Sequence, residues 1–310
     1  MKRTVVWLLI VVLFVATSST ALAEQPKVIL CHKPGTIDEA TLIVPSPAAQ
    51  AHLNHGDYLG ECVPPTTATV TGRNWEDMDA DGSVWETGDP GLAGWRIYVD
   101  YDGNAVWDEA GEPSALTAAD GSYLIGGVLP GTWPVREVSQ ADWICAYPNP
   151  ASLTGCFHEV TLSAGAVATG IDFGNWRHAL KAGYIWDDRF APFGVWDQAT
   201  EPALSGWTLE LWDVTSGSPV PLESGYTNAM GYYEFNMLMP GRTYVVCAQM
   251  SFSFEQTYPL AGTVPPAGEQ IFACAAALGE QYAPYGYQFT ALSSDAYVDN
   301  FFGNHEITLP

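Results

Sequence analysis

Two short acidic runs contain the residues best suited to chemistry. In the first, Asp77, Asp79 and Asp81 stand at alternate positions and Gly82 follows them. Calcium loops use this spacing to point successive side-chain oxygens at one cation before a sharp turn. Calcium takes about six to eight oxygen ligands, and no imidazole or thiol lies nearby to favour zinc. We therefore expect a calcium site here. The further candidate ligands downstream are Glu86 and Asp89.

The second acidic run follows the pattern less fully. Asp100, Asp102 and Asn104 alternate, but Ala105 stands where the turn glycine would be. Aspartate, asparagine and glycine also collect in turns at strand ends for backbone reasons alone. The run is therefore either a second calcium site, which we expect, or an acidic turn. The downstream candidate ligands are Asp108 and Glu112.

The first 23 residues have the pattern of a secretory signal peptide. Lys2 and Arg3 precede an apolar run from Val5 to Val15, and small residues lead to Ala23. No later apolar run approaches the ~18 residues of a membrane helix, so no span is expected after signal removal. The sequence predicts an exported protein, either secreted or held at the cell surface.

The mature chain would be strongly acidic. Without the signal it has 9 Lys and Arg against 35 Asp and Glu, a net charge of about −26 with neutral histidines. Such a surface repels nucleic acid and anionic lipid and attracts divalent cations. Nucleic acid is thus disfavoured as a partner, whereas the sequence does not identify the extracellular protein or glycan that the chain would bind.

Six cysteines in an exported chain predict disulfides. They fall in three sequential pairs, and we expect nearest neighbours to join. The predicted pairs are Cys31 with Cys62, Cys145 with Cys156, and Cys247 with Cys274.

Residues 24–64 form a small module rich in cysteine and histidine. If residues 47–56 form a short helix, His52 and His55 lie on one face, at a spacing that can chelate a transition metal. His32 and Asp57 could join them. A disulfide in this module would remove the thiolates that structural zinc sites prefer. The histidines are therefore either structural, which is our expectation, or metal ligands.

Two stretches of the chain repeat at a spacing of about 110 residues. TAADGSY at 117–123 returns as TNAMGYY at 227–233, and IDFGNW at 171–176 returns as VDNFFGN at 298–304. Self-similarity at this length indicates a duplicated globular module. Alternating apolar residues and regular Gly and Pro punctuation predict strands. We expect an all-β fold with two tandem antiparallel β-sandwiches, at residues 65–176 and 177–310.

The first copy resembles a known surface module. GRNWEDMDADGSVWETGDPGLAGW, ADGSY, LPG and DFGN occur in the order found in the B-type domain of serine-aspartate repeat surface proteins. That domain is related to collagen-adhesin B-type modules of prealbumin-like fold. The resemblance implies a secreted or cell-surface location, calcium binding, and a non-catalytic role in cell adhesion.

The second copy departs from this pattern. With Trp186 aligned to Trp75, Asp188 matches Asp77, but Phe190 and Pro192 replace the other two aspartates. We predict weak calcium binding there or none. Collagen-adhesin modules often carry a Lys–Asn isopeptide bond assisted by a buried acid. The sequence argues against one, because the first copy has no lysine, its Glu137 aligns with Cys247 of the second copy, and Lys181 is the only lysine in either copy.

These features predict a non-catalytic structural or adhesion module whose first sandwich is stabilised by calcium. The alternative is a carbohydrate-binding β-sandwich that uses exposed aromatic residues, for which Trp133, Trp143 and Trp212 are candidates. An enzyme is disfavoured, because the acids cluster in turns without a nucleophile and base beside them.

Overall fold

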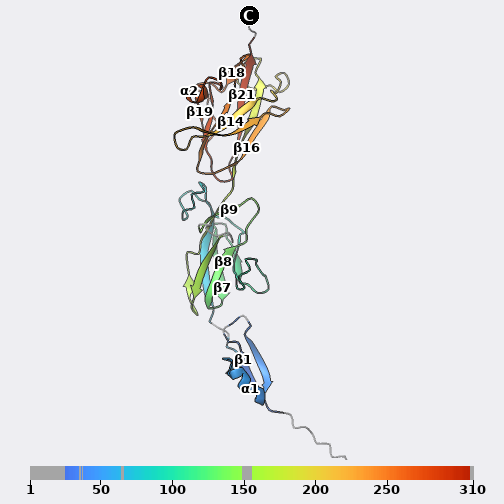
Figure 1. Ribbon diagram of the computed structural model, residues 1–310, viewed down its shortest axis with the longest axis vertical. Helices are drawn as coiled ribbons and strands as arrows, with labels where there is room; N and C mark the ends of the chain where they lie inside the picture. The colour runs from blue at the N-terminus through green and yellow to red at the C-terminus, as the bar shows by residue number, and fades with distance from the viewer. Residues whose placement is uncertain (1–24, 35, 37, 64–65, 149–155, 308–310) are drawn as a thin grey trace, which may run out of the picture. The chain divides into compact units, whose positions relative to one another are not determined.

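The computed structural model describes residues 25–34, 36, 38–63, 66–148 and 156–307 (Figure 1). The chain divides into two compact units between Pro65 and Thr66. The predicted signal peptide at residues 1–23 lies outside the described residues. Within the described ranges, no helix is long and apolar enough to cross a bilayer.

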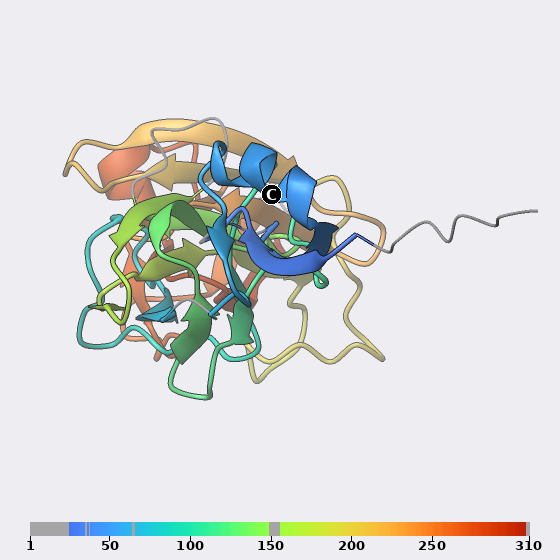
Figure 2. The ribbon, with the colours of Figure 1, turned by 90° about the horizontal axis from the view of Figure 1, so that it is seen from below.

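Unit 1 is a small antiparallel sheet with one helix beside it (Figures 1 and 2). The strand order is β2-β1-β3, with β1 at Lys27–His32, β2 at Ala40–Pro45 and β3 at Tyr58–Leu59. Helix α1 (Ser46–Leu53) has a proline in its first turn, where the missing N–H costs nothing. It ends before His55 and is thus shorter than the helix considered from the sequence.

Unit 2 contains two β-sandwiches in succession. In the first sandwich one sheet has the order β11-β4-β12-β9, with β7 also paired to β4, and the other has the order β10-β8-β5-β6. The strands are β4 (Ala68–Glu76), β5 (Arg96–Val99), β6 (Ser114–Leu116), β7 (Ser122–Val128), β8 (Gly131–Glu137), β9 (Ile144–Tyr147), β10 (Phe157–Leu162), β11 (Val167–Ala168) and β12 (Phe173–Trp176).

The second sandwich has sheets of order β16-β13-β21-β18 and β15-β14-β17-β20-β19. Its strands are β13 (Ala179–Asp187), β14 (Thr208–Asp213), β15 (Val220–Tyr226), β16 (Tyr232–Leu238), β17 (Thr243–Ala248), β18 (Phe254–Tyr258), β19 (Glu269–Phe272), β20 (Gly286–Thr290) and β21 (Ala296–Glu306). A short helix, α2 (Cys274–Leu278), follows β19.

The repeat seen in the sequence returns as a repeat of buried positions. Strands β7 and β16 have the same order of buried and exposed residues. Tyr123 and Ile125 point into the core of the first sandwich, as Tyr233 and Phe235 do in the second. Each sandwich has its own apolar cluster. The expected all-β fold with tandem sandwiches is confirmed.

The first and last strands of each sandwich pair in parallel, in sheets whose other pairs are antiparallel apart from that of β11 with β4. Strand β4 pairs in parallel with β12, and β13 pairs in parallel with β21. Gly72 and Gly183 permit the close approach, because a Cβ at either position would meet the backbone carbonyl of Ile171 or Asn300 respectively. The two glycines therefore place Ile171 and Asn300 at equivalent positions.

Candidate functional site

The structure brings the first three aspartates together. Asp77, Asp79 and Asp81 each offer an oxygen within 4.8 Å of the others. Asp77 is buried, and its Oδ2 accepts the N–H of Gly82 at 3.0 Å, so the turn glycine folds the loop back onto the first acid. Asp79 and Asp81 are exposed. A cation at this point would meet one buried and two solvated carboxylates.

Burial, with a smaller contribution from Asp79 and Asp81, raises the pKa of Asp77 to about 6 against the opposing Gly82 hydrogen bond. Three carboxylates this close repel one another when all are ionised. A divalent cation would remove that repulsion, which is the electrostatic setting of a calcium loop.

The second acidic run also gathers its carboxylates. Asp100, Asp102 and Glu112 offer oxygens within 4.8 Å of one another. Asp100 is fully buried and bound to the Arg136 guanidinium at 2.7 Å. Burial alone would raise the pKa of Asp100, but that pair and two backbone N–H groups lower it. Asn104 stays at the loop surface, where its amide donates to Asp102 at 2.8 Å. Because Arg136 already neutralises the charge of Asp100, a bound cation would relieve less electrostatic repulsion here than in the first group.

Two of the candidate ligands, Asp89 and Glu112, have a structural role that the sequence did not reveal. An acid directly before a proline closes each loop by accepting two backbone N–H groups. Asp89 accepts those of Met78 and Glu86, at 3.2 and 3.0 Å. Glu112 accepts those of Tyr101 and Asp108, at 2.9 and 3.0 Å. Glu86, Asp89 and Asp108 lie outside the two groups of gathered carboxylates, whereas Glu112 both closes its loop and belongs to the second group.

The corresponding loop of the second sandwich is also closed by an acid before a proline, but it has no group of three gathered carboxylates. Glu201 accepts the N–H groups of Phe190 and Asp197, at 3.1 and 2.9 Å. Asp188 is buried, and its Oδ2 accepts the N–H of Gly194 at 2.7 Å. No group of three potential metal ligands forms in this loop among the described residues.

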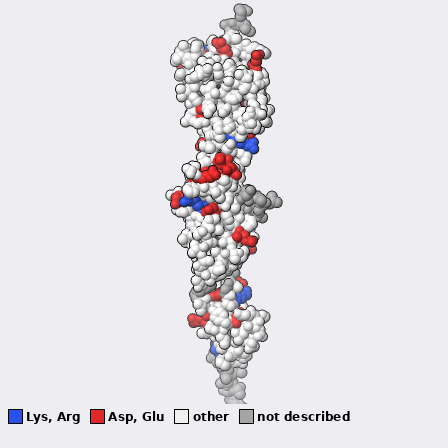
Figure 3. Space-filling model, turned by 90° about the vertical axis from the view of Figure 1, so that its left-hand side faces the viewer, with Lys and Arg blue, Asp and Glu red and all other residues white. Residues whose placement is uncertain are grey.

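On the face of the molecule in Figure 3, acidic side chains outnumber basic ones, in agreement with the composition.

A second polar group lies in the core of the second sandwich. Lys181 of β13 is fully buried, and its Nζ lies 2.5 Å from Glu269 Oε2. The side-chain amide of Asn300, on β21, donates to the same Oε2 at 2.8 Å. The rings of Tyr287 and Phe289 lie 5.1 and 4.5 Å from the lysine nitrogen. An amine, a carboxyl and a carboxamide thus meet in an apolar enclosure.

The enclosure favours the neutral form of both ionisable groups. Burial lowers the pKa of Lys181 to about 8, against the opposing effect of Glu269. Burial also raises the pKa of Glu269. Glu269 Oε1 and Asn300 Oδ1 have no hydrogen-bond partner among the described residues. The arrangement supplies a nucleophilic amine, an acceptor carbonyl and a group that can move a proton between them.

The sequence argument against a Lys–Asn bond did not anticipate this arrangement. It treated the single lysine as insufficient, yet one lysine is enough for one sandwich. Glu269 was missed because β19 has no counterpart among the described strands of the first sandwich. The repeat could have revealed Asn300 as a partner for the lysine. The residue two positions before FGN is Ile171 in the first copy and Asn300 in the second, so a polar side chain replaces an apolar one there.

The first sandwich has apolar residues at the lysine and asparagine positions, and a buried acid elsewhere. Val70 and Ile171 occupy the positions of Lys181 and Asn300. Glu137, at the end of β8, accepts the side-chain amides of Asn74 and Asn175 at 2.9 and 2.8 Å. Burial raises the pKa of Glu137 to about 8, opposed by these two hydrogen bonds. No amine lies in this group.

The six cysteines form three disulfides in the nearest-neighbour pairing, Cys31–Cys62, Cys145–Cys156 and Cys247–Cys274. The last joins the end of β17 to the start of α2 and so ties down the segment that carries Glu269.

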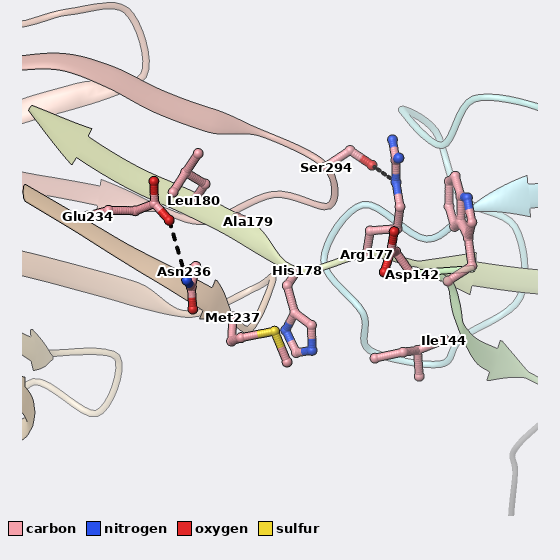
Figure 4. A pocket seen from close by; sticks show the side chains of 11 residues that line it. Asp142, Ile144, Arg177, His178, Ala179, Leu180, Glu234, Asn236, Met237 and Ser294 are labelled. Atoms are coloured by element: carbon pink, nitrogen blue, oxygen red, sulfur yellow. Dashed lines mark hydrogen bonds between the residues drawn. The ribbon is translucent and has the colours of Figure 1, made fainter. Parts of the chain in front are cut away.

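The three tryptophans considered for sugar binding have contacts of their own. Trp133 donates its Nε1–H to Leu129 O at 2.9 Å, and Trp212 meets the ring of Tyr282. Trp143 lines a hollow of about 530 Å³. Figure 4 labels other side chains of this hollow, among them Arg177 and Ser294. There Arg177 lies 4.5 Å from the Trp143 ring centre and donates to Ser294 Oγ at 2.9 Å. These contacts account for the three rings within the fold.

No protein-family model and no curated protein matches the sequence. Among solved structures, the Bacillus anthracis TIE protein is 12% identical with a TM-score of 0.29, and the alignment covers 86% of this chain and 37% of that one. The minor pilin of Streptococcus agalactiae is 12% identical (TM-score 0.27, coverage 79% and 97%). The shaft pilin SpaA of Lactobacillus rhamnosus GG is 14% identical (TM-score 0.26, coverage 79% and 100%). Similarity at this level does not define a function.

Proposed function

We propose that this chain is a non-catalytic structural module of the cell surface whose second sandwich is locked by a covalent bond between Lys181 and Asn300. The observation that carries the proposal is the shared contact of Lys181 Nζ and the Asn300 amide with Glu269 Oε2, at 2.5 and 2.8 Å. The predicted export signal and the three disulfides support the location outside the cell.

The bond would form without a cofactor. The lone pair of neutral Lys181 Nζ attacks Asn300 Cγ, and the Cγ–Nδ2 bond breaks. One Nζ proton passes through Glu269 to the departing Nδ2, which leaves as ammonia. Glu269 ends as it began, and a secondary amide joins the first and last strands. Burial promotes this step because it lowers the pKa of Lys181 and so raises the fraction of neutral amine.

Mass spectrometry of the intact mature chain, with disulfides reduced, tests this proposal. We expect a mass lower than the sequence mass by one ammonia, with the loss placed by sequencing a peptide pair that joins residues 181 and 300. Lys181→Met and Glu269→Gln should each have the full mass. A wild-type chain of full sequence mass would contradict the covalent bond.

We also propose that calcium stabilises the first sandwich through Asp77, Asp79 and Asp81, with Asp100, Asp102 and Glu112 as a second, weaker group. Support comes from the gathered oxygens of each group and the raised pKa of Asp77. Calorimetric titration of the mature chain with calcium should show binding that Asp79→Ala with Asp81→Ala reduces. Binding that survives this pair of changes together with Asp102→Ala would contradict it.

The proposed role is adhesion-associated support, with an extracellular protein or a glycan as the partner. Among the described residues, no contact of Trp133, Trp143 or Trp212 favours a glycan over a protein as that partner.

A further inference from the structure

Unit 1 contains a group of side chains that the proposed function does not use. The Oδ2 atom of Asp57 lies 2.7 Å from His32 Nδ1 and 2.8 Å from His52 Nδ1. The Asp57 side chain is only 2% exposed, whereas the two histidine side chains are 32% and 27% exposed. Two imidazole nitrogens from separate parts of the chain thus converge on one buried carboxylate oxygen.

The fold holds these residues in place from three sides. His32 ends β1, His52 lies in the last turn of α1, and Asp57 directly precedes β3. The second oxygen of Asp57 accepts the N–H of Lys33 at 3.0 Å, which fixes the carboxylate. The histidine rings meet edge to face with centres 5.3 Å apart. The donor set is therefore built into the backbone of the unit.

Unit 1 also has little apolar burial to hold it together. Among the described residues its buried apolar side chains are Leu30, Cys31 and Ala49. Modules of about 40 residues rarely close on such a core and usually need disulfides or a metal ion. One disulfide, Cys31–Cys62, is present. A metal held by residues from β1, α1 and the start of β3 would join the parts that the small core leaves weakly connected.

We propose that His32, His52 and Asp57 bind one divalent transition-metal ion of the zinc class. Two imidazoles and a carboxylate suit zinc, which prefers nitrogen and oxygen donors in a tetrahedral arrangement. The ion would replace the two Nδ1 protons between the rings and Asp57, and in the neutral rings those protons move to Nε2. The site opens on a hollow of about 500 Å³ that His55 also lines, so water or His55 can supply the fourth ligand.

Zinc titration of the mature chain, saturated beforehand with calcium to occupy the acidic loops, tests the site. We expect one zinc ion per chain, with affinity at least ~10-fold weaker in His52→Gln and in Asp57→Asn. Asp57→Asn is informative because its amide oxygen can still accept a hydrogen bond but is a poor ligand. The control His305→Gln, in unit 2, should bind zinc as the wild type does.

A measurement on the unaltered chain guards against variants that fail to fold. Zinc should shift the imidazole NMR signals of His32 and His52, leave those of His158 and His178 in place, and slow hydrogen exchange across residues 27–59. Zinc that shifts neither of the first two signals would overturn the proposal. So would zinc binding that persists in His52→Gln and disappears in Asp79→Ala with Asp81→Ala. Because neither result involves residue 181 or 300, the outcome is independent of the proposed covalent bond.

Discussion

The two sandwiches of unit 2 share their strand arrangement, and each buries a glutamate, but the side chains around the two glutamates differ. In the first, Glu137 lies between Asn74 and Asn175, and no amine is near. In the second, Glu269 lies between Lys181 and Asn300. A duplicated fold can thus keep its strands and loop-closing hydrogen bonds while the side chains buried in its core change. The first copy has two groups of gathered carboxylates in its loops, and the second has a buried lysine, glutamate and asparagine in its core.

The largest effect should come from removing the amine. Lys181→Met would prevent the covalent bond and free the chain between residues 181 and 300 in the unfolded state. By the entropy of closing a loop on the order of 100 residues, we expect the second sandwich to lose about 4–5 kcal/mol. Differential scanning calorimetry should show its transition move down while that of the first sandwich stays. A shift of the first sandwich's transition instead would contradict the placement of the covalent bond in the second sandwich.

The disulfides should follow in size. Replacing Cys247 and Cys274 by serine opens a link with a sequence separation of 27, against 11 for Cys145 and Cys156. Chain entropy gives about 3 kcal/mol for a loop of ~15 residues and more for a longer one. We expect a larger loss of stability in the second sandwich than the matched double change causes in the first, measured by urea unfolding. The second change should also slow covalent bond formation, because Cys274 anchors the segment after Glu269.

Calcium removal should act on the first sandwich alone. If calcium is present at about 100 times its dissociation constant, it stabilises the folded state by about 2.7 kcal/mol. Chelation should lower the first calorimetric transition accordingly, and Asp79→Ala with Asp81→Ala should abolish the response. Asp197→Ala, in the corresponding loop of the second sandwich, is the matched control and should respond to chelation as the wild type does.

A further effect, confined to a range of pH, concerns Glu137. A carboxyl whose pKa rises on folding, here from 4.5 to about 8, stabilises the fold fully below 4.5, and that contribution is lost as the pH rises to about 8. Glu137→Gln cannot ionise, so its melting temperature should exceed that of the wild type by a margin that grows from pH 5 to pH 8. A constant margin would show that Glu137 does not titrate in this range.

Glu269→Gln is the matching change in the second sandwich, and it distinguishes the proposed role of Glu269 from that of Glu137. It should leave Lys181 and Asn300 unjoined at every pH, since the glutamine cannot relay a proton. Glu137→Gln should leave the intact mass unaffected apart from the substitution itself.

Much of the fold was predictable because local patterns repeat. The turn glycines Gly121 and Gly231 and the alternation through β7 and β16 indicate tandem sandwiches directly. Parallel pairing of first and last strands was not predictable, because it depends on contacts between residues about 100 positions apart. The aspartate clusters were foreseen from spacing, but the roles of Asp89 and Glu112 depend on backbone N–H groups that a sequence does not display.

The buried lysine was the hardest feature to foresee. A lone Lys181 in the alternating run ALKAGYIW reads as a solvent-facing residue of a strand. Its burial depends on Glu269, which arrives from a strand of the opposite sheet. Only the folded arrangement shows that the amine has a partner.

The parallel pairing of β4 with β12 and of β13 with β21 has a mechanical consequence. A pull on the two ends of a sandwich draws its first and last strands past one another lengthwise, so the ladder hydrogen bonds between them are loaded together in shear and cannot open one at a time. In the second sandwich, a Lys181–Asn300 amide would carry that tension between adjacent strands and leave the intervening chain unstretched. Under force, the second sandwich would then keep its length while the first extends.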